Sequence, residues 1–362
     1  MNWGKGLKED ERQLLIDLIK IESPSTGETQ VAKHLCDWLS SRGIRSRVDQ
    51  VGNVIATWGK GKRTLCLLGH MDTVLPILPV ALDDASITGR GAVDAKGPLA
   101  AMASALGRVA EREDEPDGHR VLLVGAVEEE IPGSRGAKHL AKRLAKTPPI
   151  ATVIGEPSGW DRITLGYRGC LRMKLATTAP IRHSATPHGT AAEQGVDDWL
   201  RILEMARAYN EKRDDPHSLF SELSPTLLGF SSRIRGGVDE AELDISLRTP
   251  LGISSGTLFE ALKDNLTGHL TLFGAQAAYR SSRNTPLIRG FLRAIRSLGG
   301  RPTFSLKSGT SDMNVVGPEW QTSMVAYGPG DPQLSHTIAE RIRFDEYERG
   351  ILVLEQLLMN LP

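Results

Sequence analysis

Short apolar runs alternate with helical segments through the first half of this chain, and this alternation limits the folds open to it. The runs are RTLCLLGH (63–70), HRVLLVGAVEEE (119–130) and ATVIGEP (151–157). The segments GPLAAMASALGRVA (97–110) and GAKHLAKRLAK (136–146) separate them. Nearly continuous apolar strands are buried on both faces, and helices between consecutive strands are typical of parallel sheets. The pattern therefore predicts an α/β fold, with a mostly parallel sheet flanked by helices.

The sequence changes character after residue 166 and changes back near residue 282. Segments such as GCLRMKLATTA (169–179) and AELDISLRTP (241–250) alternate apolar and polar residues, which is typical of half-buried strands. A chain of 362 residues usually forms more than one domain. We expect a main domain made of residues 1–166 and 282–362, and an inserted α+β domain over residues 167–281.

Composition argues against nucleic-acid and membrane partners and favours a reducing compartment. The 44 basic and 44 acidic residues cancel, so bulk charge offers no attraction to nucleic acid or to a membrane surface. The start MNWGKGLKEDERQLL lacks the apolar core of a signal peptide, and no apolar stretch reaches the roughly 18 residues of a membrane helix. Three widely separated cysteines fit a reducing compartment. We expect a cytoplasmic protein.

Polar side chains that bind metals or move protons follow the predicted parallel strands. His70 and Asp72 come after the first strand, residues 128–130 are three glutamates after the second, and Glu156 follows the third. His336 comes shortly after another apolar run, QTSMVAYGPGD (321–331). Because ligands bind at the carboxyl ends of strands in open α/β sheets, we expect these groups to converge at one edge.

Asp94 adds a further carboxylate from the segment GRGAVDAKGP (89–98), just before a predicted helix. Imidazole and carboxylate groups suit zinc or a similar divalent ion, and a carboxylate can bridge two ions. Two ions about 3.5–4 Å apart can act together in hydrolysis. The sequence thus predicts a metal centre, whose cations would neutralise the three consecutive glutamates.

Two local patterns predict turns and helix ends. Ser25 and Glu28 have the spacing of a capping box at the start of a helix that should end near Gly43. Alternating residues on both sides of Gly52 and Asn53 predict a β-hairpin.

Five motifs in order resemble the acetylornithine deacetylase / succinyl-diaminopimelate desuccinylase family of co-catalytic zinc hydrolases. They are LLGHMDTV (67–74), GRGAVDAKG (89–97), VEEEIPGSRGA (127–137), GEPS (155–158) and HSATPHGTAA (183–192). The resemblance covers nearly the whole chain, including the position of the insert. It implies a zinc-peptidase-like catalytic domain with an inserted lid and dimerisation domain, and a homodimer.

The resemblance also implies which side chains would bind the two metal ions. His70 and Glu156 would complete the shell of one ion, and Glu130 and His336 that of the other. Asp94 would bridge both ions. The ions are expected to be zinc, although histidine and carboxylate ligands also accept cobalt.

The remaining roles follow from the same resemblance. Asp72 would orient the His70 ring through its second nitrogen. Glu129 would be the general base that takes a proton from the attacking water and passes it to the departing amine. His183 in the insert would reach toward a partner's active site and stabilise the oxyanion, and Arg248 would bind a substrate carboxylate.

Substrate class is the least constrained of these inferences. The run GEPSGWDRITLGYRGCLRMKL (155–175) is similar to hydrolases that release lysine, and in some cases ornithine, from an acidic amino-group carrier protein of the LysW type. That activity would serve lysine and arginine biosynthesis. The insert would then present a basic surface, and its candidate cations are Arg168, Arg172, Lys174 and Arg182.

The alternatives are a small-molecule deacylase acting on acetylornithine or succinyl-diaminopimelate, a dipeptidase, and a non-catalytic binding protein of the same fold. An enzyme is favoured over the last, because His70, Asp94, Glu129, Glu130, Glu156 and His336 are all present.

Overall fold

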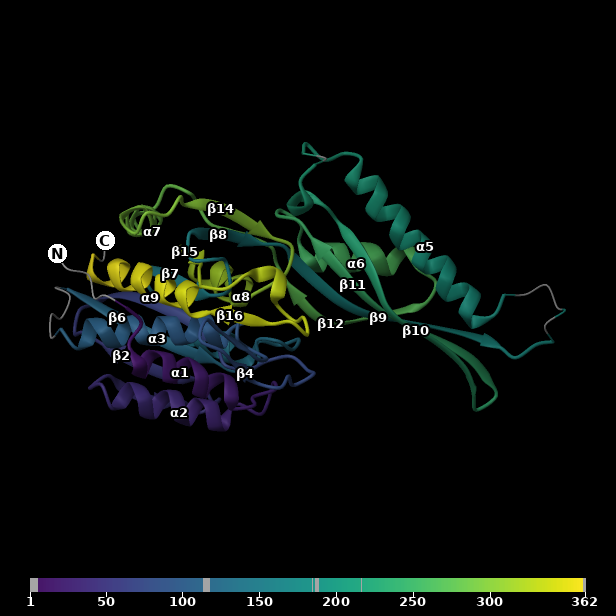
Figure 1. Cartoon of the computed structure of the whole chain (residues 1–362). Coiled ribbons are helices and arrows are strands. Elements are labelled where there is room, and N and C mark those ends of the chain that lie inside the picture. The colour runs from purple at the N-terminus through teal and green to yellow at the C-terminus, as the bar shows by residue number, and fades with distance from the viewer. Residues whose placement is uncertain (1–5, 113–117, 184, 186–188, 216, 361–362) are drawn as a thin grey trace. The chain divides into compact units, whose positions relative to one another are not determined.

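The structure is a computed structural model that describes residues 6–112, 118–183, 185, 189–215 and 217–360 (Figure 1). The chain divides into two compact units. The first unit consists of Met1–Gly166, Ser281–Leu306 and Ser311–Pro362, and the second of Tyr167–Arg280 and Lys307–Thr310. None of the helices in the described ranges combines the length and apolar character that a membrane crossing requires.

The main sheet of the first unit has a parallel centre and antiparallel edges. Its described strands follow the order β1-β2-β6-β3-β7-β15-β8, and β14 pairs with β8. Strand β3 pairs in parallel with β6 and β7, and β7 pairs in parallel with β15. The bounds are β1 Arg45–Val48, β2 Val54–Trp58, β3 Arg63–His70, β6 His119–Ala126, β7 Ala151–Gly155, β8 Arg162–Tyr167, β14 Thr303–Lys307 and β15 Ser323–Ala326. The predicted α/β fold with a mostly parallel sheet is confirmed.

Helices cover both faces of this sheet. They are α1 Glu9–Lys20, α2 Thr29–Ser40, α3 Lys96–Ala110, α4 Arg135–Leu144, α7 Pro286–Ser297, α8 Asp312–Trp320 and α9 Phe344–Met359. Helix α3 is buried along almost its whole length, which explains why its sequence is apolar and rich in alanine all round. It packs against α1 and α9, and Figure 1 shows α3 and α9 side by side. A small sheet of β4 Ala81–Leu82, β5 Ser86–Thr88 and β16 Arg341–Arg343 completes the unit.

The second unit is a four-stranded antiparallel sheet covered by two helices. Its strand order is β10-β11-β9-β12, with β9 Gly169–Pro180, β10 Ser224–Arg235, β11 Val238–Thr249 and β12 His269–Gln276. The helices are α5 Ala191–Asn210 and α6 Ser255–Asn265, and the two-residue strand β13 is Tyr279–Arg280. Strand β9 alternates buried residues with half-buried or exposed ones from Leu171 to Pro180, as its sequence predicted. The core of this unit is separate from that of the first.

The local predictions near the N-terminus had different outcomes. Strands β1 and β2 pair antiparallel around residues 49–53, so the hairpin prediction is confirmed. The capping-box prediction is wrong, because α2 begins at Thr29 with Glu28 as its N-cap and no side-chain cap hydrogen bond. Ser25 and Glu28 instead bond to residues that are distant in the sequence, and these contacts belong to the site.

Candidate metal centre

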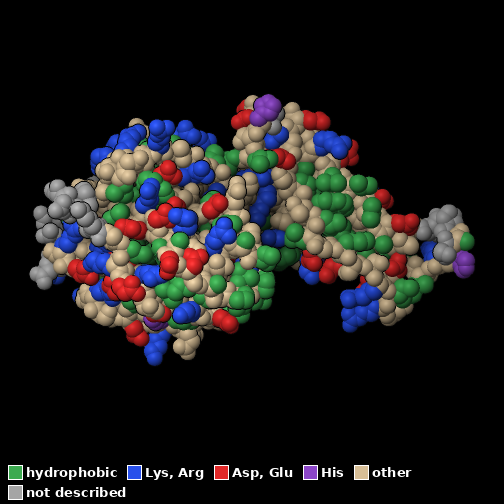
Figure 2. Space-filling view, in the orientation of Figure 1, with side chains coloured by type: hydrophobic (Ala, Val, Ile, Leu, Met, Phe, Trp, Pro, Cys, Tyr) green, Lys and Arg blue, Asp and Glu red, His purple; other side chains and the backbone are tan. Residues whose placement is uncertain are grey.

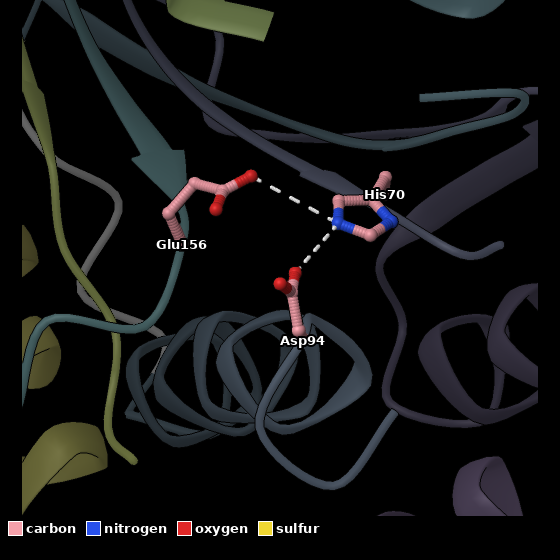
Figure 3. A group of neighbouring side chains, drawn as sticks. All are labelled: His70, Asp94 and Glu156. Atoms are coloured by element: carbon pink, nitrogen blue, oxygen red, sulfur yellow. Dashed lines mark hydrogen bonds and ion pairs between the residues drawn. The ribbon is translucent and has the colours of Figure 1, made fainter. Parts of the chain in front are cut away.

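The carboxyl ends of two parallel strands and the start of one helix bring a histidine and two carboxylates together. His70 ends β3 and is 2% exposed. Its Nε2 atom lies 3.3 Å from Oδ1 of Asp94 and 3.8 Å from Oε1 of Glu156 (Figure 3). Asp94 lies just before α3, and Glu156 directly follows β7. Both carboxylates therefore point at the same ring nitrogen.

A second histidine approaches the other side of Asp94. Nε2 of His336 lies 3.3 Å from Oδ2 of Asp94 and 3.0 Å from Oε1 of Glu130. His336 has a φ of 63°, a left-handed conformation that a residue with a β-carbon adopts only where its surroundings hold it there. One carboxylate thus contacts two histidines, each through a different oxygen.

The donor atoms fall into overlapping groups of the size that binds a metal ion. Within the described residues, these groups are His70–Asp94–Glu156, His70–Glu129–Glu130 and Asp94–Glu130–His336, and the ligand atoms of each lie within 4.8 Å of one another. Imidazole nitrogens and carboxylate oxygens are the donors that zinc and related ions take. The residues present therefore fit a centre of two ions that share Asp94.

Asp72 organises the backbone of this cluster as well as the His70 ring. Nδ1 of His70 lies 3.0 Å from the Asp72 carbonyl oxygen and 3.4 Å from its Oδ1. The backbone N–H of Glu129 donates to Oδ1 of Asp72, and that of Glu130 donates to Oδ2, both at 3.0 Å. The fully buried Asp72 carboxylate consequently fixes both the histidine and the glutamate loop.

Buried carboxylates crowd this cluster and shift the pKa values of its members. Burial raises the pKa of Glu129 and of Glu130 above that of a free glutamate. Hydrogen bonds to Asp94 and Glu130 raise the pKa of His336 to about 10. Although burial opposes it, contacts with aspartate carboxylates also raise the pKa of His70. Each of these four groups is therefore easier to protonate than a free one, because buried carboxylates crowd together in the cluster. Divalent ions would supply the missing charge.

Glu340 holds the two loops that carry Asp94 and His336, and no sequence motif pointed to it. Its Oε1 accepts hydrogen bonds from the backbone N–H groups of Gly91, Val93 and Asp94, each at 3.0 Å. Its Oε2 pairs with Nη1 of Arg90 at 2.7 Å. That guanidinium also donates to the carbonyl of Thr337, next to His336. The only sequence signal is a glutamate four residues after His336.

Ser25 and Glu28 form another supporting contact that sequence reasoning misassigned. The Ser25 hydroxyl donates to Oδ2 of Asp72 at 2.7 Å. Oε1 of Glu28 accepts from the backbone N–H of Thr26 at 3.1 Å and of Glu128 at 3.0 Å. This turn therefore supports Asp72 and the first residue of the glutamate run rather than capping a helix.

The two predicted residues of the insert, His183 and Arg248, lie in the second unit. The exposed His183 ring accepts a hydrogen bond from the backbone N–H of Ala185 through Nδ1. Its neighbours at positions 184 and 186–188 lie outside the described residues. Arg248, on β11, is half-buried and its Nη1 lies 3.4 Å from the Thr310 hydroxyl.

Two of the four cations predicted to form a basic surface on the insert have structural partners. Arg168 is 3% exposed and donates to the Ser224 hydroxyl at 2.8 Å and to the Arg248 carbonyl at 3.2 Å. Lys174 is exposed but pairs with Glu242 at 2.9 Å. Arg168 is therefore buried rather than displayed, and the charge of Lys174 is offset. The expectation of a basic surface at these two positions is not supported.

The fold and the cluster define a class of hydrolase, and comparison with known families agrees. Residues 66–360 match the model of peptidase family M20/M25/M40, and the chain belongs to this family. The family resemblance predicted from the five motifs is thus confirmed. Among solved structures, an M20 family metallo-carboxypeptidase from Sulfolobus solfataricus shares the fold, with a TM-score of 0.80 at 20% identity, covering 97% of this chain and 99% of the other.

Curated relatives align over nearly the full length. A [LysW]-lysine hydrolase from Deinococcus radiodurans is 37% identical over 354 residues, which cover 97% of this chain and 96% of the relative. A [LysW]-lysine/[LysW]-ornithine hydrolase from Saccharolobus islandicus is 28% identical over 356 residues, covering 97% of each. Both relatives extend through the insert as well as the main unit.

Proposed function

We propose that this chain is a two-metal amidohydrolase that releases lysine, and also ornithine, from the terminal glutamate side chain of an acidic LysW-type carrier protein. The observation that carries the proposal is the position of Asp94 between two histidines, 3.3 Å from each through separate oxygens. The names of the full-length relatives support the substrate. Such an enzyme would work in the cytoplasm, in lysine and arginine biosynthesis.

The roles of the cluster residues follow from their contacts. His70 and Glu156 would hold one ion, Glu130 and His336 the other, and Asp94 both. The ions, zinc or alternatively cobalt, would act as Lewis acids on the scissile carbonyl when bound. Asp72 keeps the Nδ1 side of His70 occupied, so that Nε2 faces the cluster.

Glu129 is the proposed general base. Unlike Glu128 and Glu130, its side chain is paired with neither Arg135 nor His336. Burial raises its pKa, which makes its carboxylate a better proton acceptor. Its backbone is fixed by Asp72, so the carboxylate can take a proton from the attacking water and deliver it to the leaving amine.

The second unit would provide substrate contacts and a dimer interface. We propose that His183 stabilises the oxyanion in a partner's active site and that Arg248 binds a substrate carboxylate. Strand β10 is an edge of its sheet and displays exposed apolar residues, including Leu228 at 53% and Ile234 at 67%. Hydrophobic side chains gather on the face of this unit seen in Figure 2. Long exposed edges of this kind favour pairing with a second copy, and the molar mass in solution tests the dimer.

A hydrolysis assay with added zinc or cobalt tests the activity. It compares a lysine-loaded acidic carrier protein with N-acetylornithine and N-succinyl-diaminopimelate. We expect the highest kcat/KM for the carrier conjugate. A preference for either small molecule would refute the carrier substrate, and a correctly folded protein that binds no divalent ion would refute the whole proposal.

A further inference from the structure

Helix α4 carries a row of positive charge away from the catalytic loop. No Asp or Glu occurs between Glu130 and Glu156. Within that stretch the exposed cations are Arg135, Lys138, Lys142, Arg143 and Lys146. Arg135, at the helix start, pairs with Glu128 of the catalytic loop at 2.7 Å. The ten residues of the helix then span roughly 15 Å.

A groove of about 570 Å³ lies where α4 ends. Its apolar lining includes Ile55, Leu122 and Leu140, all of which are buried. Its charged lining consists of Arg45, Arg47, Lys60, Arg120 and Arg143. None of the described residues that line the groove is acidic, and its five cations come from four segments of the chain.

Strand register explains why these cations share one side of the sheet. Arg45 of β1 is opposite Thr57 of β2, and Arg47 is opposite Ile55, so all four side chains lie on the same face. Thr57 is in turn opposite Leu122 of β6, two residues from Arg120. Strand β1 is an edge of the sheet, and its Arg45 and Arg47 side chains are exposed.

Five of these cations have no acidic partner among the described residues. Within the described part of the chain, Arg45, Arg47 and Arg143 form no ion pair, and neither do Lys138 and Lys142. By contrast, the helix α5 cation Arg201 and strand cations Lys174 and Arg233 are paired. An unpaired set of cations beside apolar lining is a surface that attracts polyanions.

We propose that this surface binds the acidic carrier protein while its conjugated glutamate occupies the metal centre. The α4 surface is defined as Arg45, Arg47, Arg120, Lys138, Lys142 and Arg143. The inference rests on the proposed function. A run of cations that begins at the catalytic loop and continues roughly 15 Å into a groove is too long for one small anion. It matches a polypeptide with several carboxylates on one side.

Charge reversal tests the α4 surface. One variant carries Lys138→Glu and Lys142→Glu on α4, and a second carries Arg45→Glu and Arg47→Glu in the groove. The readouts are kcat and KM for the lysine-loaded carrier and for Nα-(γ-glutamyl)lysine, which has the same amide without the carrier. We expect each variant to raise KM for the carrier at least about tenfold and to weaken its dependence on salt. Hydrolysis of the small amide should stay within about twofold of wild type.

The matched control reverses two exposed arginines elsewhere on the first unit. Arg289→Glu with Arg293→Glu on α7 makes the same change in net charge at exposed positions. We expect this control to keep the wild-type KM. An equal rise in KM for the control, an unchanged KM in both test variants, or an equal loss on the small amide would overturn the α4 surface. If wild type cleaves the small amide but not the carrier conjugate, the proposed substrate fails and the α4 surface fails with it.

Discussion

At the scale of single residues, the three consecutive glutamates have different surroundings and hence different chemistry. Glu128 pairs with Arg135 and Glu130 with His336, whereas burial and nearby carboxylates raise the pKa of Glu129. We predict that Glu129→Gln lowers kcat by a factor of roughly 10² to 10⁴ and leaves metal content unchanged. Steady-state kinetics and metal analysis of the same sample check this. Near-normal turnover in a fully loaded variant would remove Glu129 as the base.

Glu340 supports a second prediction at this scale, because it positions loops that carry proposed metal ligands and lies outside the candidate donor groups. In Glu340→Gln, one oxygen can still accept from the loop amides, but the new NH₂ group would face Arg90. We expect metal affinity to fall about 10–100-fold, as for other residues that orient ligands. Chelator competition measures this, and the absorption spectrum of the cobalt form reports altered ligand geometry.

The exposed helix-capping Glu193→Gln is the matched control for Glu340→Gln, since it removes the same charge from the second unit. Normal affinity and an unchanged cobalt spectrum in Glu340→Gln would contradict a positioning role.

The metal-binding candidates were predictable from sequence, whereas their supports were not. His70, Glu130 and Glu156 follow strands whose apolar composition marks them as parallel and buried, and topology alone then places them at one edge. The Asp72 carboxylate, by contrast, accepts hydrogen bonds from backbone amides at the end of a different strand. Glu340 accepts them from the amides of a distant loop. Such hydrogen bonds depend on tertiary packing, and no local spacing encodes them.

At the scale of elements, the junction between β6 and α4 depends on very close packing. The Asn53 side chain accepts from the backbone N–H of Val127 and donates to the carbonyl of Gly136, both at 3.1 Å. A β-carbon on Gly136 would lie 2.4 Å from Oδ1 of Asn53 and 2.6 Å from the Val127 nitrogen. The start of α4 and the end of β6 therefore tolerate only glycine at this position.

We predict that Gly136→Ala lowers the free energy of unfolding by about 1–3 kcal/mol and also lowers kcat, because the adjacent glutamate loop must shift. Denaturant unfolding and kinetics measure the two effects. Gly256→Ala in α6 is the control, since its β-carbon would have only the Ser254 hydroxyl at 4.0 Å. That control should keep or slightly raise stability. Equal stability of Gly136→Ala and wild type would refute the packing argument.

At the scale of elements, prediction failed where groups distant in the sequence compete for the side chains of a local pattern. Ser25 and Glu28 have capping-box spacing, but the buried Asp72 carboxylate and the Glu128 amide need hydrogen-bond partners more than an exposed helix start does. Arg168 shows the same limit, because an arginine in a strand sequence does not reveal that carbonyl oxygens will surround it.

At the scale of the whole molecule, metal binding should reverse the pH dependence of stability. In the metal-free chain the pKa values of His70, Glu129, Glu130 and His336 are all raised. The folded chain then binds more protons than the unfolded chain between about pH 5 and pH 9, so its stability falls as pH rises. The lowered pKa values of Asp72 and Asp94 act only below about pH 4.

Thermal unfolding of EDTA-treated protein across this pH range checks the sign. We expect its Tm to fall as pH rises, while the Tm in excess zinc or cobalt holds or rises because deprotonated ligands bind metal better. The gap between the two curves should widen with pH. Parallel curves would contradict a cluster that exchanges protons for metal ions.

The first unit is built from segments that precede and follow the second unit, so its parts are synthesised at different times. Residues from His70 to Glu156 leave the ribosome before the second unit, but His336 is made only after it. At ~5–20 residues per second, on the order of ten seconds or more separates Glu156 from His336. During that interval the nascent chain carries the candidate ligands His70, Asp94, Glu130 and Glu156 but not His336. Loading of the proposed pair of metal sites would therefore come late, after the second unit is made, and a truncated chain ending in the second unit should not bind both ions.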